Sequence, residues 1–323
     1  MRLMEGRIVL ESPAIITQRR VERGFVKPAD HIPGSMLRGA ILTALFRSGM
    51  LSQADLKREA EEPSLLASPA YPVWNSARSA PATPFMFYCR KCGTVIDTTP
   101  ESTDMLRRDE EPRLPLLHEC GEPYKPLYGS LIMGANGKLK GVRVHTFRAS
   151  SAAIGKDRGS IVREMLFDYE AIAEGTEFWA WILAPDWLHT TRIEVAVGRG
   201  QSRGFGWGEL RLEPTSQPPQ QTQGVFVAFS PLLALQSLQW GGCTVTQMKI
   251  FGRTIRQQAG WDYAYGFRPI VQLAGRGSII LAEVSGEAAA MLRVGLPVKV
   301  AGSWLTGINA LLSVDDYYRV LGD

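Results

Sequence analysis

The stretch VGRGQSRGFGWGEL, from Val197 to Leu210, sets the local fold because it packs five glycines and two arginines between two β-prone runs. TRIEVAV precedes it and ELRLEP follows it, so the sequence predicts a loop that joins one strand to the next. A dinucleotide-binding fingerprint needs a helix directly after its glycines. A P-loop needs Gly-Lys followed by Ser or Thr, which is absent here. The loop therefore belongs to neither class.

The residue types of this loop are typical of contact with single-stranded RNA. Glycine-rich backbone exposes N–H groups that can approach phosphates, and Arg199 and Arg203 supply positive charge. Phe205 and Trp207 supply flat surfaces on which bases stack. The alternative is a glycine-rich hairpin whose glycines serve backbone geometry alone and whose arginines are solvated. The loop by itself leaves both interpretations open.

The whole chain has the composition of a globular protein. It has 323 residues, of which 45% are hydrophobic, and a formal charge of only +4. Any nucleic-acid contact must therefore come from a local concentration of lysine and arginine. The length suits two domains. The opening sequence MRLMEGRIVLESPAIIT contains no apolar run long enough for a signal peptide or a membrane span, so we expect a cytoplasmic protein.

Hydrophobic spacing predicts a mixture of helices and strands. A polar, proline-bearing segment at Thr215–Gly224 predicts a domain boundary. The basic stretch Val142–Ser160 is predicted to be an exposed loop. The expected strands are Arg2–Ser12, Ile161–Phe167, two runs of Leu166–Ala184 on either side of Gly175, and Val225–Ser230; the expected helices are Gly39–Met50, Gln53–Glu62 and the closing TGINALLSVDDYYRVL (306–321).

Three motifs, in this order, resemble the RAMP superfamily of CRISPR effector subunits. They are HIPGSMLRGAIL (His31–Leu42), YEAIAEGTEFWAWI (Tyr169–Ile182) and GRGQSRGFGWGEL (Gly198–Leu210). The resemblance implies an α+β fold with two ferredoxin-like (RRM-like) domains in tandem. It implies an N-terminal domain at 1–214 and a divergent C-terminal domain at 215–323. The cysteine-bearing segment at about 85–125 lies outside the resemblance and is expected to be an insertion in the N-terminal domain. RPIVQLAGRGSIILAEV in the second half resembles the type III-D member that is similar to the subunit capping the 5′ end of the guide.

The resemblance implies a non-catalytic, guide-RNA (crRNA) binding subunit of a type III, III-D-like, interference complex. Such a subunit holds the 5′ repeat-derived tag and contacts other RAMP subunits and the large signalling subunit, and it meets target RNA indirectly. Ser35 is expected to cap the first helix and Arg38 to face the RNA backbone. The alternative for this turn is plain helix initiation with a solvated arginine.

Other basic residues extend the expected RNA contacts. A basic stretch near the N-terminus contains Arg19, Arg20, Arg23 and Lys27. Arg143, Arg148 and Arg158 are candidates for contact with RNA or with a neighbouring subunit, and the alternative is a solvated loop. The predicted RNA-binding residues are Ser35, Arg38, Gly198, Arg199, Gly200, Gln201, Ser202, Arg203, Gly204, Phe205, Trp207, Arg19, Arg20 and Arg148.

The cysteines predict a structural metal site. Cys89-Arg-Lys-Cys92-Gly has the form of a zinc knuckle, and His118-Glu-Cys120-Gly follows some twenty-five residues later. Four ligands of these types close a tetrahedral zinc site, which would order a proline- and charge-rich insertion that lacks a core of its own. His118 lies one residue nearer to Cys120 than a standard knuckle requires. The alternative is three reduced cysteines in a loop with His118 on the surface, while the isolated Cys243 is expected to be structural.

Asp30 is the candidate for a catalytic residue, because it lies directly before the IPGS turn that opens the first helix. In the target-cleaving backbone subunits of the resembled superfamily, an aspartate in this loop cleaves RNA. Asp30 and His31 have ordinary roles as loop residues, and no base partner follows from the spacing. RNA endonuclease activity through Asp30 is therefore the alternative function, and a zinc-stabilised scaffold with no RNA role is a third.

Overall fold

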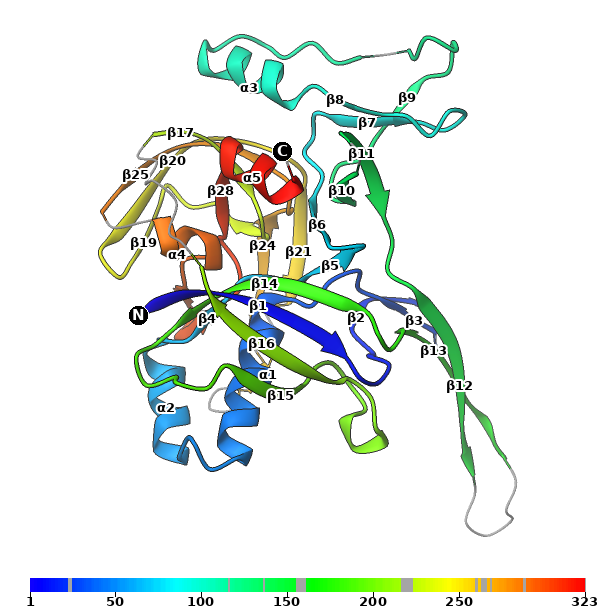
Figure 1. Ribbon diagram of the computed structural model, residues 1–323, viewed down its shortest axis with the longest axis vertical. Helices are drawn as coiled ribbons and strands as arrows, with labels where there is room; N and C mark the ends of the chain where they lie inside the picture. Colours follow the sequence, from blue (N-terminus) through cyan, green and yellow to red (C-terminus); the bar gives the residue numbers. More distant parts are fainter. Residues whose placement is uncertain are drawn as a thin grey trace.

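The computed structural model describes residues 1–22, 25–115, 117–135, 137–154, 161–215, 223–258, 261–262, 266–267, 269–286 and 289–322. The fold is α+β, with mostly antiparallel sheets and few helices. A large sheet runs through the middle of the molecule (Figure 1). The cysteine-bearing insertion lies at the top, a long hairpin projects at the lower right, and the C-terminal half lies to the upper left.

The large sheet has nine strands in the order β11-β10-β6-β5-β14-β1-β16-β15, with β4 also paired to β14. β1 lies between β14 and β16, where Ile8 is opposite both Phe178 and Leu210. These three side chains point toward one face and are buried, as alternation in a half-buried strand requires. The strands are β1 (Arg2–Leu10), β4 (Leu66–Ala67), β5 (Tyr71–Trp74), β6 (Ala77–Pro81), β10 (Leu131–Ala135), β11 (Lys138–Val142), β14 (Glu177–Ala184), β15 (Arg192–Ala196) and β16 (Trp207–Pro214).

Helix α1 (Gly34–Arg47) covers the inner face of this sheet. Leu37, Ile41 and Leu45 follow one another at helical spacing and are fully buried against it. The helix begins five residues before the predicted start at Gly39. Helix α2 (Gln53–Glu61) matches its prediction to within one residue, and Ser52 and Asp55 form a reciprocal capping box at its start.

A second sheet of four strands forms the projecting hairpin and its root, in the order β12-β13-β3-β2. The basic stretch predicted as a loop contains strand β12, so that prediction is wrong for residues 146–154. β12 pairs along its length with β13, and Arg148 is opposite Glu170. The strands are β2 (Thr17–Glu22), β3 (Phe25–Pro28), β12 (Thr146–Ile154) and β13 (Ile161–Ile172).

The C-terminal half consists of short antiparallel sheets and two helices. Its five-stranded sheet has the order β19-β20-β25-β17-β28, and a three-stranded sheet has the order β18-β24-β21. The remaining pairs are β22-β23 and β26-β27. The elements are β17 (Gln223–Ala228), β18 (Leu232–Leu233), β19 (Ser237–Trp240), β20 (Cys243–Phe251), β21 (Thr254–Gln258), β22 (Trp261–Asp262), β23 (Gly266–Phe267), β24 (Ile270–Ala274), β25 (Ile279–Ser285), α4 (Ala289–Val294), β26 (Val298–Val300), β27 (Ser303–Leu305), β28 (Leu311–Ser313) and α5 (Val314–Leu321).

The closing segment TGINALLSVDDYYRVL was predicted to be one helix, and this is wrong for its first half. Leu311–Ser313 forms β28, which pairs with β17, and the helix begins only at Val314. Ser313 caps it by accepting a hydrogen bond from the Asp316 N–H at 3.1 Å. Cys243 is buried as expected, and burial raises the pKa of its thiol to about 11.

The two halves of the chain share a hydrophobic core. Trp179 and Tyr71 from the large sheet pack against Phe229 and Tyr317 from the C-terminal half. The Tyr71 and Phe229 rings meet edge to face at 4.8 Å. The predicted linker Thr215–Gly224 falls mostly on residues 216–222, which lie outside the described residues.

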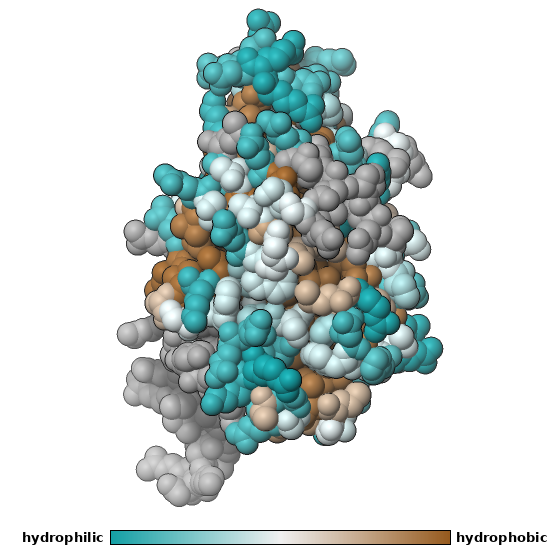
Figure 2. Space-filling model, turned by 90° about the vertical axis from the view of Figure 1, so that its left-hand side faces the viewer, coloured by the Kyte–Doolittle hydropathy of each residue, from teal (hydrophilic) through white to brown (hydrophobic). Residues whose placement is uncertain are grey.

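The insertion is a small module on top of this shared core. Its sheet has the order β8-β7-β9, from β7 (Met86–Cys89), β8 (Val95–Asp97) and β9 (Tyr124–Pro126), and helix α3 (Thr99–Arg107) follows β8. Mainly hydrophilic side chains cover the top of the molecule in Figure 2. Within the described ranges, every helix is too short or too polar to cross a bilayer.

Candidate RNA interface and metal centre

The glycine loop is shaped by close packing of the chain on itself. Four of its glycines have φ values of 78° to 85°, namely Gly198, Gly200, Gly204 and Gly206. A Cβ on Gly198 would lie 2.4 Å from the Ile15 carbonyl oxygen, and one on Gly206 would lie 1.9 Å from that of Val197. Backbone geometry therefore accounts for these two glycines. A Cβ on Gly204 would meet nothing within 4 Å, so the tip of the loop is open.

The tip is a short 3-10 turn, η1 (Gln201–Arg203), between two left-handed glycines. The side-chain amide of Gln201 donates to the Ala196 carbonyl at 3.1 Å and closes the loop. Ser202 and Arg203 are exposed at the tip. Arg199 is exposed too, and no ion pair in the described part of the chain involves it. The loop thus presents two guanidinium groups to solvent.

One of these arginines joins the loop to the hairpin sheet. The Arg203 guanidinium carbon lies 5.8 Å from the ring centre of Phe205 and 5.9 Å from that of Tyr169 on β13. The two rings meet edge to face at 5.6 Å. Phe205 and Trp207 are half-buried, and the Trp207 indole N–H donates to the Gln201 carbonyl at 3.4 Å. The loop is therefore an ordered aromatic and cationic surface, not a free turn.

The hairpin sheet carries three further predicted residues. Arg148 is exposed on β12, one outer strand, while the backbone of Arg19 and Arg20 lies in β2, the other outer strand. The side chains of Arg19 and Arg20 lie outside the described residues, as do Arg23 and Arg158 entirely. Tyr169 on β13 links this sheet to the loop. Arg148 is opposite Glu170, the residue next to Tyr169, so its side chain points to the other face of the sheet.

Ser35 and Arg38 do not belong to this surface. The helix begins at Gly34 after Pro33 with no side-chain cap, so Ser35 does not cap it and that prediction is wrong. A Cβ on Gly307 would lie 2.2 Å from the Ser35 nitrogen, so the C-terminal half covers this end of the helix. A phosphate at the Ser35 amide would collide with the chain.

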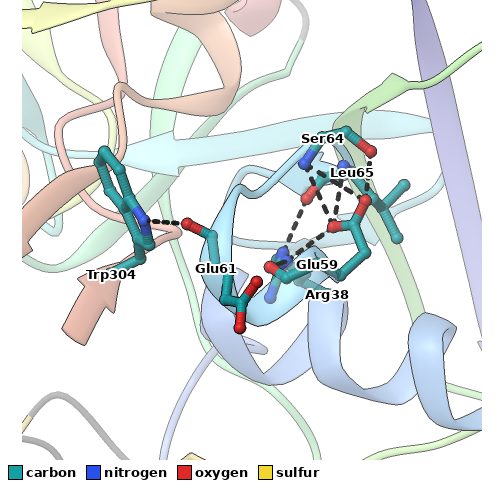
Figure 3. Close-up of polar contacts among 6 residues, drawn as sticks. All are labelled: Arg38, Glu59, Glu61, Ser64, Leu65 and Trp304. Atoms are coloured by element: carbon teal, nitrogen blue, oxygen red, sulfur yellow. Dashed lines mark hydrogen bonds and ion pairs between the residues drawn. The ribbon is translucent and has the colours of Figure 1, made fainter. Parts of the chain in front are cut away.

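Arg38 is buried, with 7% of its surface exposed, so the alternative of a solvated arginine is also wrong. Its guanidinium lies 2.7 Å from the Glu59 carboxylate and donates at 2.7 Å to the Leu65 carbonyl and to the Glu59 carbonyl (Figure 3). Glu59 in turn accepts from the Ser64 N–H. Arg38 thus ties the end of α2 to α1, and its charge is satisfied within the protein.

Asp30 and His31 contact an arginine from the far end of the sequence. Arg276 lies in the second glycine-arginine turn, between β24 and β25, and its guanidinium is 2.6 Å from the Asp30 carboxylate. His31 Nδ1 lies 2.9 Å from Asp30 Oδ1 and 2.8 Å from an Arg276 nitrogen. Arg276 also donates to the Gly129 carbonyl at 2.8 Å. The group holds the pre-helix loop to the C-terminal half.

The electrostatics of this group suit an ion pair better than proton transfer. Burial alone would raise the pKa of Asp30. The hydrogen bond to His31 and the charge of Arg276 together outweigh burial and hold that pKa well below its usual range. Burial and Arg276 both lower the pKa of His31. Near neutral pH, Asp30 is therefore ionised and His31 neutral. A carboxylate with such a low pKa is a weak general base.

The four predicted metal ligands lie together. The ligand atoms of Cys89, Cys92, His118 and Cys120 are all within 4.8 Å of one another. The Cys89 and Cys120 sulfurs are 3.6 Å apart, and the Cys92 sulfur is 3.7 Å from His118 Nδ1. Tetrahedral zinc with bonds of about 2.3 Å to sulfur places two sulfurs about 3.8 Å apart. The site could hold such a metal ion.

Two glycine turns explain how the irregular spacing still brings the four ligand atoms together. Gly93 and Gly121 have φ values of 69° and 81°, and each donates its N–H back into its own turn, to Cys89 at 2.8 Å and to His118 at 2.8 Å. The short His118-to-Cys120 spacing is met by presenting Nδ1, the nearer ring nitrogen, toward the other ligands. The Tyr124 ring contacts the imidazole edge to face at 5.5 Å.

No protein-family model matches the sequence, and the comparison with curated proteins finds no match. Solved structures do match. A chain of the type III-B Cmr-beta complex bound to cognate target RNA superposes with a TM-score of 0.52 at 11% identity, covering 86% of each chain. The same complex with cognate target RNA and AMPPnP gives 0.50 at 10% identity over the same shares. This protein shares the fold of a type III-B Cmr-beta subunit.

The α+β fold that the resemblance implies is thus shared with a chain of this complex. Of the predicted residues, those of the glycine loop lie together and the metal ligands form one cluster, whereas Arg148 lies on the other face of the hairpin sheet from Tyr169. Sequence reasoning missed Tyr169, although it lies in one of the RAMP-like motifs, because nothing in a strand pattern says which loop a residue faces. It also missed Arg276, which lies in the second-half stretch RPIVQLAGRGSIILAEV.

Proposed function

We propose that this protein is a non-catalytic RNA-binding subunit of a type III CRISPR effector, which holds the 5′ repeat-derived tag of the guide RNA and contacts neighbouring effector subunits in the cytoplasm. Its fold over most of the chain is shared with a subunit of a complex that binds cognate target RNA. The observation that carries the proposal is the joined surface of loop and hairpin sheet. There, exposed Arg203 lies beside Tyr169 and Phe205, and Arg199 is exposed in the same loop.

The chemistry of this surface suits a single strand. Arginines pair with phosphates without reading sequence, and aromatic rings stack on any base. The Arg203 side chain already lies near two rings, so a bound phosphate would meet a guanidinium whose position is partly fixed. Less side-chain entropy is then lost on binding.

The tandem arrangement of two ferredoxin-like domains, divided near residue 214, is part of the same proposal. It is supported by the separate sheets of the C-terminal half and by the use of a glycine-arginine turn before a strand in each half. The two turns differ in use: Arg203 is exposed at the tip of the first, whereas Arg276 in the second is engaged with Asp30.

We also propose that the Cys3His cluster holds structural zinc. Four protein ligands would leave no open coordination position, so the ion would order the module and take no part in a reaction. The Tyr318 hydroxyl of α5 donates to Asp97 of β8 at 2.6 Å, which links the module to the C-terminal half. The zinc would therefore stabilise a contact surface at the top of the molecule.

The endonuclease alternative is less well supported. Asp30 is the loop carboxylate that such activity would use, and it is ion-paired with Arg276 in this structure. Cleaved RNA that persists when Asp30 is replaced by alanine would rule out this residue, whereas cleavage that vanishes in a folded Asp30→Ala variant would restore the alternative.

The proposal is tested by measuring the affinity of a fluorescently labelled single-stranded RNA over a series of salt concentrations. Each phosphate neutralised on a single strand contributes about −0.7 to the slope of log K against log salt. Arg199→Ala combined with Arg203→Ala should weaken binding and reduce the slope by about 1.4. Arg107→Ala with Arg319→Ala removes the same charge from exposed sites on α3 and α5 and serves as the control. Equal affinity of the loop variant and the control would refute the role of the loop.

A further inference from the structure

Two exposed aromatic rings stack at the root of the hairpin sheet. The Trp74 indole, at the end of β5, and the His145 imidazole, directly before β12, have ring centres 4.9 Å apart and planes tilted by 35°. Trp74 is 38% exposed and His145 is exposed. A solvent-facing stacked pair drawn from two distant stretches of sequence is not required by the core, because both rings lie at its edge.

The backbone on both sides fixes the pair. Trp74 precedes a two-residue turn to β6 in which Asn75 and Ser76 have φ values of 47° and 66°. Such a turn favours Asn-Gly, so serine at its second position is strained and persists only where the surroundings hold it. The His145 carbonyl accepts a hydrogen bond from the Ala173 N–H at 2.9 Å. The rings are therefore presented on rigid elements.

The surroundings of the pair carry positive charge. Arg143, two residues before His145, is exposed. Lys138 and Lys140 are exposed too, on β11, which lies three strands from β5 in the large sheet. Glu174, the residue after Ala173, is exposed as well. The chain continues from His145 directly into β12, where Ala149 is opposite Tyr169, so the pair lies at the start of a strand that borders the proposed RNA surface; Figure 1 shows β12.

We propose that Trp74 and His145 form a stacking platform for one unpaired base of the bound RNA. The inference rests on the proposed function and adds a second point of attachment to it. The Trp74 and His145 rings contact each other through one face each. The other face of the indole would be the surface on which a base stacks. The exposed Arg143, two residues before His145, suits a phosphate next to that base. A platform at one end of the hairpin and arginines at the glycine loop would together set the direction of the strand.

The test uses the full chain with a fluorescein-labelled single-stranded oligoadenylate as the probe. Trp74→Ala should weaken binding by roughly tenfold, the size expected for loss of one stacked base, while Trp74→Phe should keep most of the affinity. Trp187→Ala is the matched control, because Trp187 is 40% exposed in the connection after β14. RNA should also quench tryptophan fluorescence, and Trp74→Phe should lose part of that quenching, which gives a readout even if Trp74→Ala fails to fold.

The outcomes separate the two proposals. Weaker binding by Trp74→Ala with unchanged binding by Trp187→Ala supports the platform. Full affinity of Trp74→Ala, together with loss of affinity when Arg199 and Arg203 are replaced, overturns the platform and leaves the proposed function standing. If the unmodified chain binds no RNA, both fall. If Trp74→Ala keeps its RNA affinity but no longer binds a neighbouring subunit, the ring pair is a protein contact and the inference is wrong.

Discussion

The guanidinium of Arg276 lies 2.6 Å from the carboxylate of Asp30, so the second glycine-arginine turn closes on the loop before α1. The same arginine lies 5.7 Å from the ring centre of Tyr71, whose hydroxyl donates to the Phe229 carbonyl. These contacts hold the pre-helix loop, the large sheet and the C-terminal half together. The second glycine-arginine turn therefore holds parts of the protein together and does not present its arginine to solvent.

Arg276→Ala should lower the free energy of unfolding by about 2 kcal/mol, because it leaves the Asp30 carboxylate partly buried without its partner. We place the loss below that of a fully buried pair because 31% of the Asp30 side chain is exposed. Urea denaturation measures it. Asp30→Asn combined with Arg276→Ala should recover part of the loss, and a single variant as stable as the unmodified protein would show that the pair contributes nothing.

His31 should make the protein less stable in mild acid. Its folded-state pKa is lowered by burial and by Arg276, so the unfolded chain takes up a proton below about pH 6.5 that the folded chain resists. Stability is then fully present above that pH and falls as the pH decreases toward 5. Thermal unfolding between pH 7.5 and 5 compares the protein with His31→Gln. Parallel curves for the two would contradict this account of His31.

Arg38→Ala should reduce stability without reducing RNA affinity, and Arg199→Ala should reduce RNA affinity without reducing stability. Arg38 and Glu59 expose only 8% and 6% of their side chains, so removing the arginine should cost about 3 kcal/mol of stability. At temperatures well below the melting temperature of the variant, Arg38→Ala should leave the affinity for RNA unchanged. Arg199→Ala should leave the melting temperature unchanged and weaken RNA binding. A loss of RNA affinity in folded Arg38→Ala would return this residue to the interface.

Metal removal should loosen the insertion and the helix attached to it. Chelation should increase hydrogen exchange roughly tenfold in β7–β9 and raise it in α5, which the Tyr318–Asp97 hydrogen bond joins to the module. Cys92→Ser should reproduce this effect and reduce the metal content. Cys243→Ser is the control, because that thiol is buried outside the cluster and should keep the metal. Equal exchange with and without chelator would mean that no metal orders the module.

Local patterns predicted much of the fold. Alternation located β1 and the strands around Gly175, and helical spacing located α1 and α2, because each reports which face of an element is buried. The closing segment misled because Leu311 and Leu312 are apolar at a spacing that suits either a helix or a buried strand. Pairing with β17 decides for the strand, and that partner lies more than eighty residues away in the chain.

The candidate sites also differ in how much of them could be predicted from the sequence. The metal cluster followed from residue types alone, since thiolates and imidazole at short spacings have few other uses. The surroundings of each arginine could not be predicted from residue types. Arg38, Arg203 and Arg276 all lie near glycine in RAMP-like stretches, yet one is buried against Glu59, one is exposed at a loop tip and one is bound to Asp30. Their partners come from other parts of the chain, which no local pattern reveals.

The most direct test of the central claim is ultraviolet crosslinking of the purified effector complex, followed by mass spectrometry of peptide–RNA adducts. The account predicts adducts on the glycine loop, at residues 198–208, that carry nucleotides of the repeat-derived tag. Guide RNA present in the complex without any adduct on this loop would contradict the account. The glycines would then serve the geometry of the turn alone.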